Sequence, residues 1–183
     1  MKQYFFQFIN RLATGRNVII IILVWLSYAI FVMGLSQTSS PDSIVPIDIT
    51  FAPSVTTICN MIEAYGEDVR RSYMRGEITW DAIYPLLYGL MLLLGLSYGM
   101  RVAGINFAHK DKLFLLPLVV MGADYCENVG IVTLLWMYPS CSLEVAAFVS
   151  IFVTLKWVTT VICFLMLIAI FFVSLFRKIR GHK

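Results

Sequence analysis

The chain has 183 residues, of which 60% are hydrophobic and only 14% are charged, and its formal net charge is +3. This composition excludes an ordinary soluble globular protein and is typical of a protein that crosses the membrane several times. A chain of this length has room for one helical membrane domain and a modest extramembrane segment, without a second globular domain. The small positive charge reflects membrane orientation and gives no support to nucleic-acid binding.

Four stretches are apolar over about 20 residues, the helical length needed to cross about 30 Å of hydrocarbon. The sequence therefore predicts an all-α polytopic membrane protein, a four-helix transmembrane bundle with an external amphipathic helix. The predicted segments are, in chain order, a cytoplasmic N-terminus (1–17), TM helix 1 (18–35), an external segment (36–80) with an amphipathic helix at about 54–75, TM helix 2 (81–101), a cytoplasmic loop (102–112), TM helix 3 (113–138), an external loop (139–143), TM helix 4 (144–176) and a cytoplasmic tail (177–183).

The first apolar stretch follows Lys2, Arg11 and Arg16, as the core of a signal peptide would. Signal-peptide cores hold about 7 to 15 apolar residues, and this stretch is longer. Residues 36–41 are also a poor match to the small residues of a cleavage site. We expect an uncleaved helix.

The long external segment begins with a polar part punctuated by prolines, and an amphipathic helix follows. Ser54 is the expected N-cap and Gly76 the expected stop. Apolar residues recur at spacings of three and four, which places them on one face: Val55, Ile58, Ile62, Tyr65, Val69 and Tyr73. Such a helix either packs on the bundle or forms a lid over a ligand entrance.

The distribution of Lys and Arg predicts the orientation of the bundle. Basic residues occur in the N-terminal segment, in loop 102–112 and in the tail. In the external segment three arginines are outnumbered by six acidic residues, and the loop 139–143 has no basic residue. Because basic loops are retained in the cytoplasm, both termini are expected to be cytoplasmic.

TM helix 3 contains two carboxylates and an amide, Asp124, Glu127 and Asn128. Insertion of an Asp at the centre of a membrane helix costs about 2.5 to 3.5 kcal/mol, so an ionisable residue there indicates a functional site. The spacing i, i+3, i+4 places all three side chains on one helical face. That face is expected to look toward neighbouring helices or a wet cavity.

TM helix 4 supplies a partner, Lys156. The short loop before it forces an antiparallel hairpin, in which Glu127 lies level with residues 154–156 and Asp124 lies about one turn nearer the cytoplasm. The sequence therefore predicts an ion pair between Glu127 and Lys156. At about 1.5 Å per residue from Met137, this level is about 15 Å deep, near the middle of the membrane.

Two carboxylates facing one ammonium leave a surplus negative charge, for which the neutral form is favoured in low dielectric. We expect one carboxyl, Asp124 in preference, to be protonated unless an arginine of the external segment folds inward. A neutral carboxyl beside an ion pair suits a general acid, a proton relay or a hook for a head group. The alternative is that the whole cluster is polar glue between helices.

Further candidates surround this level. Thr159 and Thr160 follow Lys156 at i+3 and i+4 and suit the lining of a ligand site. Tyr84 and Tyr88 on TM helix 2 point their hydroxyls toward the cluster or, alternatively, anchor the helix at the interface.

Several other chemistries have little support. His109 and His182 fall in cytoplasmic segments, so no metal site is predicted, and no cofactor motif is present. Cys126 and Cys163 are expected to pack as small apolar groups. Cys59 and Cys141 both fall outside, where an oxidising compartment would allow them to form a disulfide.

Several motifs stand between about Asp48 and Trp157: Glu63-Ala-Tyr-Gly-Glu67 with Arg71 and Tyr73, Asp81-Ala-Ile-Tyr-Pro-Leu-Leu-Tyr-Gly89, Leu116-Pro117, Asp124-Tyr-Cys-Glu-Asn128, Tyr138-Pro139, and Ser150-Ile-Phe-Val-Thr-Leu-Lys-Trp157. They resemble those of a family of small four-span bacterial inner-membrane proteins without an assigned activity. The resemblance implies a multi-pass protein of the bacterial inner (plasma) membrane and brings no reaction with it. A looser architectural likeness is to the emopamil-binding-protein-like sterol isomerases, whose characteristic His and Glu positions are not found here.

Three functions follow from these observations. The first is binding of, or action on, a lipid or apolar small molecule, with Asp124, Glu127, Asn128 and Lys156 on its head group. The second is a structural or accessory subunit whose ion pair fixes helix packing, with a membrane partner protein or a second copy of the chain. The third is proton-coupled transport by an oligomer. Whether the chain is an enzyme stays open; if it is one, Asp124, Glu127 and Lys156 are the catalytic candidates.

Overall fold

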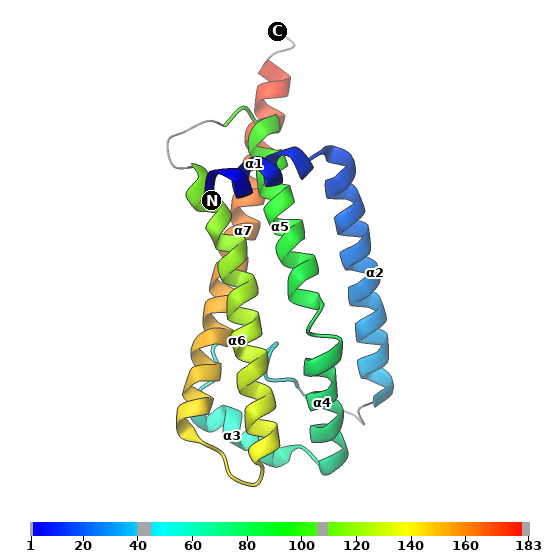
Figure 1. The fold of residues 1–183 in the computed structure, drawn as a ribbon, viewed down its shortest axis with the longest axis vertical. Coiled ribbons are helices and arrows are strands. Elements are labelled where there is room, and N and C mark those ends of the chain that lie inside the picture. Colours follow the sequence, from blue (N-terminus) through cyan, green and yellow to red (C-terminus); the bar gives the residue numbers. More distant parts are fainter. Residues whose placement is uncertain (1, 40–44, 106–109, 181–183) are drawn as a thin grey trace.

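The computed structural model describes residues 2–39, 45–105 and 110–180 (Figure 1). The protein is all-helical, with 84% helix and no strand among the described residues. The elements are α1 (Lys2–Leu12), α2 (Gly15–Ser39), α3 (Val55–Ala64), α4 (Glu67–Thr79), α5 (Tyr84–Val102), the short 3-10 helix η1 (Lys110–Phe114), α6 (Leu115–Met137) and α7 (Leu143–Arg180).

Three helical stretches of the described chain are long and apolar enough to cross a membrane: Tyr84–Val102, Lys112–Met137 and Leu143–Arg180. A fourth is added if the bent pair formed by Tyr4–Leu12 and Gly15–Phe31 is one span. Large apolar side chains on these helices remain exposed, as expected for contact with lipid: Ile30 is 72% exposed and Leu165 60% exposed. Length and composition thus suggest a membrane protein.

The N-terminal segment is helical, although no helix was predicted there. α1 meets α2 at 84° and lies across one end of the bundle (Figure 1). Phe6 and Ile9 of α1 are buried against the bundle, whereas Tyr4 and Phe8 are exposed. The residues of the expected termini and loops at positions 40–44, 106–109 and 181–183, among them His109 and His182, lie outside the described residues.

The prediction of a single amphipathic helix at about 54–75 is wrong, because two helices, α3 and α4, occupy the region. Ser54 does cap the first, accepting a hydrogen bond from the Thr57 backbone N–H at 3.1 Å. The helix breaks at Tyr65 and Gly66, whose backbones are extended. Tyr65 is buried and its hydroxyl donates to the Val45 carbonyl at 2.8 Å, so tertiary contacts fix the break. α4 then runs through Gly76 to Thr79, because packing outweighs the low helical propensity of one glycine.

The helices pack as two apolar layers with a polar layer between them. α6 packs along α7, α5 contacts both, and α2 stands at the edge against α5 (Figure 1). One core includes Leu92, Val120 and Cys163, near α1. The other core includes Ile131 and Val153, near α3. Asp124, Glu127 and Asn128 lie on α6 between Val120 and Ile131, and thus between the two cores.

α4 and α5 follow each other along the bundle and are separated by a break at residues 80–83 (Figure 1). This break faces Asn128 of α6, which lies inside the candidate span Lys112–Met137. Irregular backbone at membrane depth is tolerated only where it is buried in protein or lines a cavity, because its polar groups need partners. The second predicted span, 81–101, thus corresponds to α5 and part of this break.

Candidate functional site

Lys156 of α7 is the centre of the polar layer. Its Nζ lies 2.8 Å from Glu127 Oε2 and 3.2 Å from Asp124 Oδ1. The expected ion pair is therefore present, and one ammonium bridges both acids of α6. Glu127 is fully buried and Asp124 is 3% exposed. Because the acids are one turn apart on one helix and Lys156 faces them from the antiparallel neighbour, the α6–α7 hairpin alone builds this part of the site.

Tyr88 of α5 contacts the acid cluster of α6 through Asp124. Its hydroxyl donates to Asp124 Oδ2 at 2.5 Å. Tyr84, one turn earlier, does not bond the acids; its ring lies 5.3 Å from that of Tyr88 and 6.4 Å from that of Tyr28 on α2. Of the two tyrosines considered, Tyr88 contacts the cluster, and Tyr84 continues an aromatic row from it to the edge helix.

Three side chains from neighbouring helices form hydrogen bonds with the break between α4 and α5. Tyr28 donates to the Trp80 carbonyl at 2.7 Å and Tyr125 donates to the Ala82 carbonyl at 2.9 Å. Asn128 donates to the carboxylate of Asp81 at 2.7 Å. The backbone carbonyls freed by the break thus have partners, and Asp81 joins the cluster as a third carboxylate.

Glu77 is a fourth carboxylate, which the sequence reasoning missed. It is 5% exposed, and its Oε2 has no hydrogen-bond partner among the described residues. Burial, followed by the negative charges of Asp48, Asp81 and Glu127, raises the pKa of Glu77 well above its usual range, and Lys156 opposes this rise. A signal existed: Glu77 continues the inward-facing series Val69, Tyr73 at a spacing of four.

Asp48, a fifth carboxylate, closes the cluster from the external segment. It accepts a hydrogen bond from the Tyr73 hydroxyl at 2.7 Å, and its backbone carbonyl accepts one from the Trp157 indole at 3.1 Å. These contacts tie the segment around fully buried Ile47 to α4 and α7. The apolar face of α3 packs into the same core as Ile47. Of the two roles considered for the external amphipathic helix, this contact agrees with packing on the bundle.

The remaining predicted residues have other surroundings. Thr159 donates to the Leu155 carbonyl of its own helix at 2.6 Å, and Thr160 is half-buried. Cys59 and Cys141 form a disulfide, which joins α3 to the α6–α7 loop. Cys163 is buried and Cys126 is half-buried, and neither is bonded. In the part of the chain that the structure describes, no three His, Cys, Asp or Glu side chains are grouped to hold a metal ion.

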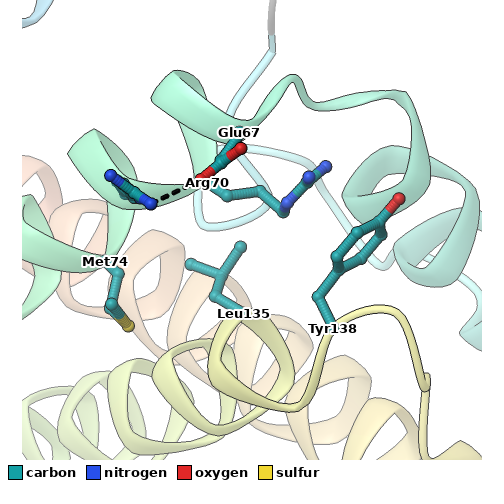
Figure 2. Close-up of a pocket in the computed structure, with 6 residues that line it drawn as sticks. Glu67, Arg70, Met74, Leu135 and Tyr138 are labelled. Carbon is teal, nitrogen blue, oxygen red and sulfur yellow. Dashed lines mark hydrogen bonds and ion pairs between the residues drawn. The ribbon is translucent and has the colours of Figure 1, made fainter.

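A separate pocket of about 300 Å³ opens at the C-terminal end of α6, away from these acids. Its lining comes from α4 and from the end of α6: Glu67, Arg70, Arg71, Met74, Leu135 and Tyr138 (Figure 2). The Arg70 guanidinium lies 3.6 Å above the Tyr138 ring. None of the residues predicted for the intramembrane site lines this pocket.

The polar layer has more acceptors than donors. Five carboxyl groups act on one another and on a single ammonium group: Asp48, Glu77, Asp81, Asp124, Glu127 and Lys156. The amide oxygen of Asn128, which is 6% exposed, also has no donor among the described residues. Such an arrangement can bind protons or a cationic donor group.

Comparisons with protein-family models, with curated proteins and with solved structures find no match for this chain.

Proposed function

We propose that this chain is a four-span protein of the bacterial inner membrane, with both termini cytoplasmic, that binds the basic head group of a lipid or apolar small molecule in its polar layer. The ligand class is an amphiphilic amine. Its ammonium group would lie among Glu77, Asp81 and Asn128, and its apolar part would extend into the membrane.

One observation carries this proposal: buried acceptor atoms without donors stand in a cluster of surplus negative charge. Glu77 Oε2 and Asn128 Oδ1 have no hydrogen-bond partner among the described residues. A buried acceptor left unsatisfied costs about 1 to 3 kcal/mol, and more when it is charged. An ammonium group supplies three donors and one positive charge, which match what the cluster lacks.

The aromatic row gives the ligand a path from the lipid. Tyr28 and Tyr84 are both half-buried, and they stack at the contact between α2 and α5. Tyr88 continues the row to Asp124. Tyrosine faces attract cations and tolerate acyl chains, so the row suits the passage of an amphiphilic amine.

The test is the binding of dodecylamine to the purified full chain in mild detergent, compared with its neutral N-acetyl derivative. Dodecylamine is expected to bind at least about tenfold more tightly, since a charge-assisted hydrogen bond is worth about 1.5 to 3 kcal/mol. Glu77→Gln should weaken amine binding and leave the binding of the amide unchanged.

The matched control is Glu63→Gln, because Glu63 is an exposed acid of α3 outside the cluster. Its affinity for dodecylamine should equal that of the wild-type chain. Equal affinity of wild type for the amine and the amide would reject the proposal, as would equal losses in Glu77→Gln and Glu63→Gln.

A second candidate, the structural or accessory role, is favoured by the close packing around Lys156, whose ammonium already bridges two buried acids. Because Lys156 bridges both acids, the neutral test variant is the triple Asp124→Asn, Glu127→Gln, Lys156→Met. Replacement of a whole buried ion cluster is often neutral for stability, whereas removal of one partner costs about 3 to 5 kcal/mol. A triple variant that folds and complements a deletion of the gene favours the structural role. One that folds and fails to complement would reject it.

A further inference from the structure

The pocket lined by α4 and the end of α6 lies at the end of a candidate membrane span. Tyr138 follows directly on the candidate span Lys112–Met137. Trp136 beside it is 78% exposed, and Leu143 at the start of the next span is 62% exposed. Exposed tryptophan and tyrosine at the end of a span mark the interface between hydrocarbon and water.

The chemistry of the pocket is that of an amphiphilic anion site. Two guanidinium groups, those of Arg70 and Arg71, face one carboxylate, that of Glu67, so the lining carries one net positive charge. Leu135 and Met74 form an apolar floor beneath them (Figure 2). Planar guanidinium groups match phosphate oxygens in geometry, and the apolar floor suits the first carbons of an acyl chain.

Arg70 is held in position before any ligand arrives. Its guanidinium donates to the Tyr65 carbonyl at the end of α3 and lies over the Tyr138 ring. Arg71 is exposed and pairs with Glu67 at 2.5 Å, a surface pair that a phosphate could displace at little cost. The pocket therefore combines one fixed and one releasable guanidinium.

We propose that this pocket binds the phosphodiester of an outer-leaflet phospholipid, with Arg70 and Arg71 on its oxygens. The inference is independent of the proposed amine site, because the two share no residue, and it rests on the proposed function only for the side of the membrane. It would make the α4–α6 junction a lipid contact that stabilises the external end of the bundle.

The experiment measures phosphatidylglycerol binding to the full chain by native mass spectrometry, with diacylglycerol of the same acyl chains as the phosphate-free control. Phosphatidylglycerol is expected to bind and diacylglycerol to bind at least about tenfold more weakly. Arg71→Gln should lower the affinity for phosphatidylglycerol about tenfold. Arg75→Gln is the matched control, because Arg75 is an exposed arginine of the same helix outside the pocket.

Glu67→Gln gives an effect of opposite sign, which misfolding cannot imitate. It frees Arg71 and should tighten phosphatidylglycerol binding several-fold. Equal losses in Arg71→Gln and Arg75→Gln, or equal binding of the two lipids to wild type, would overturn the inference. Displacement of the lipid by equimolar inorganic phosphate would overturn it in favour of a soluble anion.

Discussion

At the scale of single residues, Glu77 departs most from what helix packing requires. It is 5% exposed, it has no ion pair among the described residues, and its nearest charged neighbours include three other acids. Without a bound cation, an ionised carboxylate in this position would be strongly destabilising, so the pKa of Glu77 rises well above its usual range. Lys156 does not form an ion pair with Glu77, because its ammonium already bridges Asp124 and Glu127.

This residue gives the protein a pH-dependent stability. A carboxyl whose pKa is raised by folding binds its proton more tightly in the folded state than in the unfolded state. Its contribution to stability is therefore complete below the unfolded pKa, about 4.3, and is lost as the pH rises through the folded value. We expect the melting temperature to fall from pH 6 to pH 9, and to fall less in Glu77→Gln. Parallel melting curves for the two proteins over this range would contradict the assignment.

At the scale of elements, close packing of α6 on α7 sets the register of the ion cluster. Gly130 lies one turn from Glu127, and a methyl group at this position would lie 2.5 Å from Val149 Cγ2. Gly122 of the same helix would meet nothing within 4 Å. The hairpin therefore depends on one of these two glycines and not on the other.

Gly130→Ala should lower the free energy of unfolding by about 1 to 3 kcal/mol, because overpacking shifts the helices apart. Gly122→Ala should be neutral or stabilising by up to about 1 kcal/mol, since alanine favours the helix. Denaturation in detergent measures both. Equal effects of the two substitutions would show that the α6–α7 contact is not as close as described.

The disulfide between Cys59 and Cys141 also stabilises the arrangement of the helices, since it joins α3 to the α6–α7 loop. Replacement of Cys59 and Cys141 by alanine should lower the free energy of unfolding by about 2 to 4 kcal/mol, a typical value for a natural disulfide. Reductant should lower the melting temperature of the wild-type chain and leave the double variant unchanged. Cys126→Ala serves as the control, because Cys126 is unbonded. A wild-type chain insensitive to reductant would reject the bond.

At the scale of the whole molecule, the basic residues and the disulfide divide the bundle into two ends. Arg101 and Arg177 cap backbone carbonyls at the end where α1 lies, whereas Cys59 and Cys141 are bonded near the opposite end. A basic end retained in the cytoplasm and a bonded end in an oxidising compartment agree with one orientation.

This orientation is tested with reporter fusions. A reporter that is active only in the cytoplasm should be active when fused after Lys183 and inactive when fused after Tyr138. The reverse pattern, or activity at both positions, would reject cytoplasmic termini.

The sequence by itself determined the helical class, the apolar spans and the pairing of Lys156 with Glu127. Each of these follows from short-range rules: hydropathy over about 20 residues, a helical period of 3.6 and a loop too short for any arrangement but a hairpin. The bridging of Asp124 by Lys156 was not predicted, because the hairpin register pairs Lys156 with Glu127 and places Asp124 about one turn nearer the cytoplasm.

Only the tertiary structure decided which other residues join the cluster. The division of the expected external helix at Tyr65 and Gly66, the break near Asp81 and the burial of Glu77 depend on contacts between segments far apart in the chain. The sequence of α4 is polar and charged, as in an exposed helix, yet packing against α6 buries Glu77. Local patterns place Asp124 and Glu127 on one face of α6 and Glu77 on the inward face of α4. The five acids meet only because these distant segments fold together.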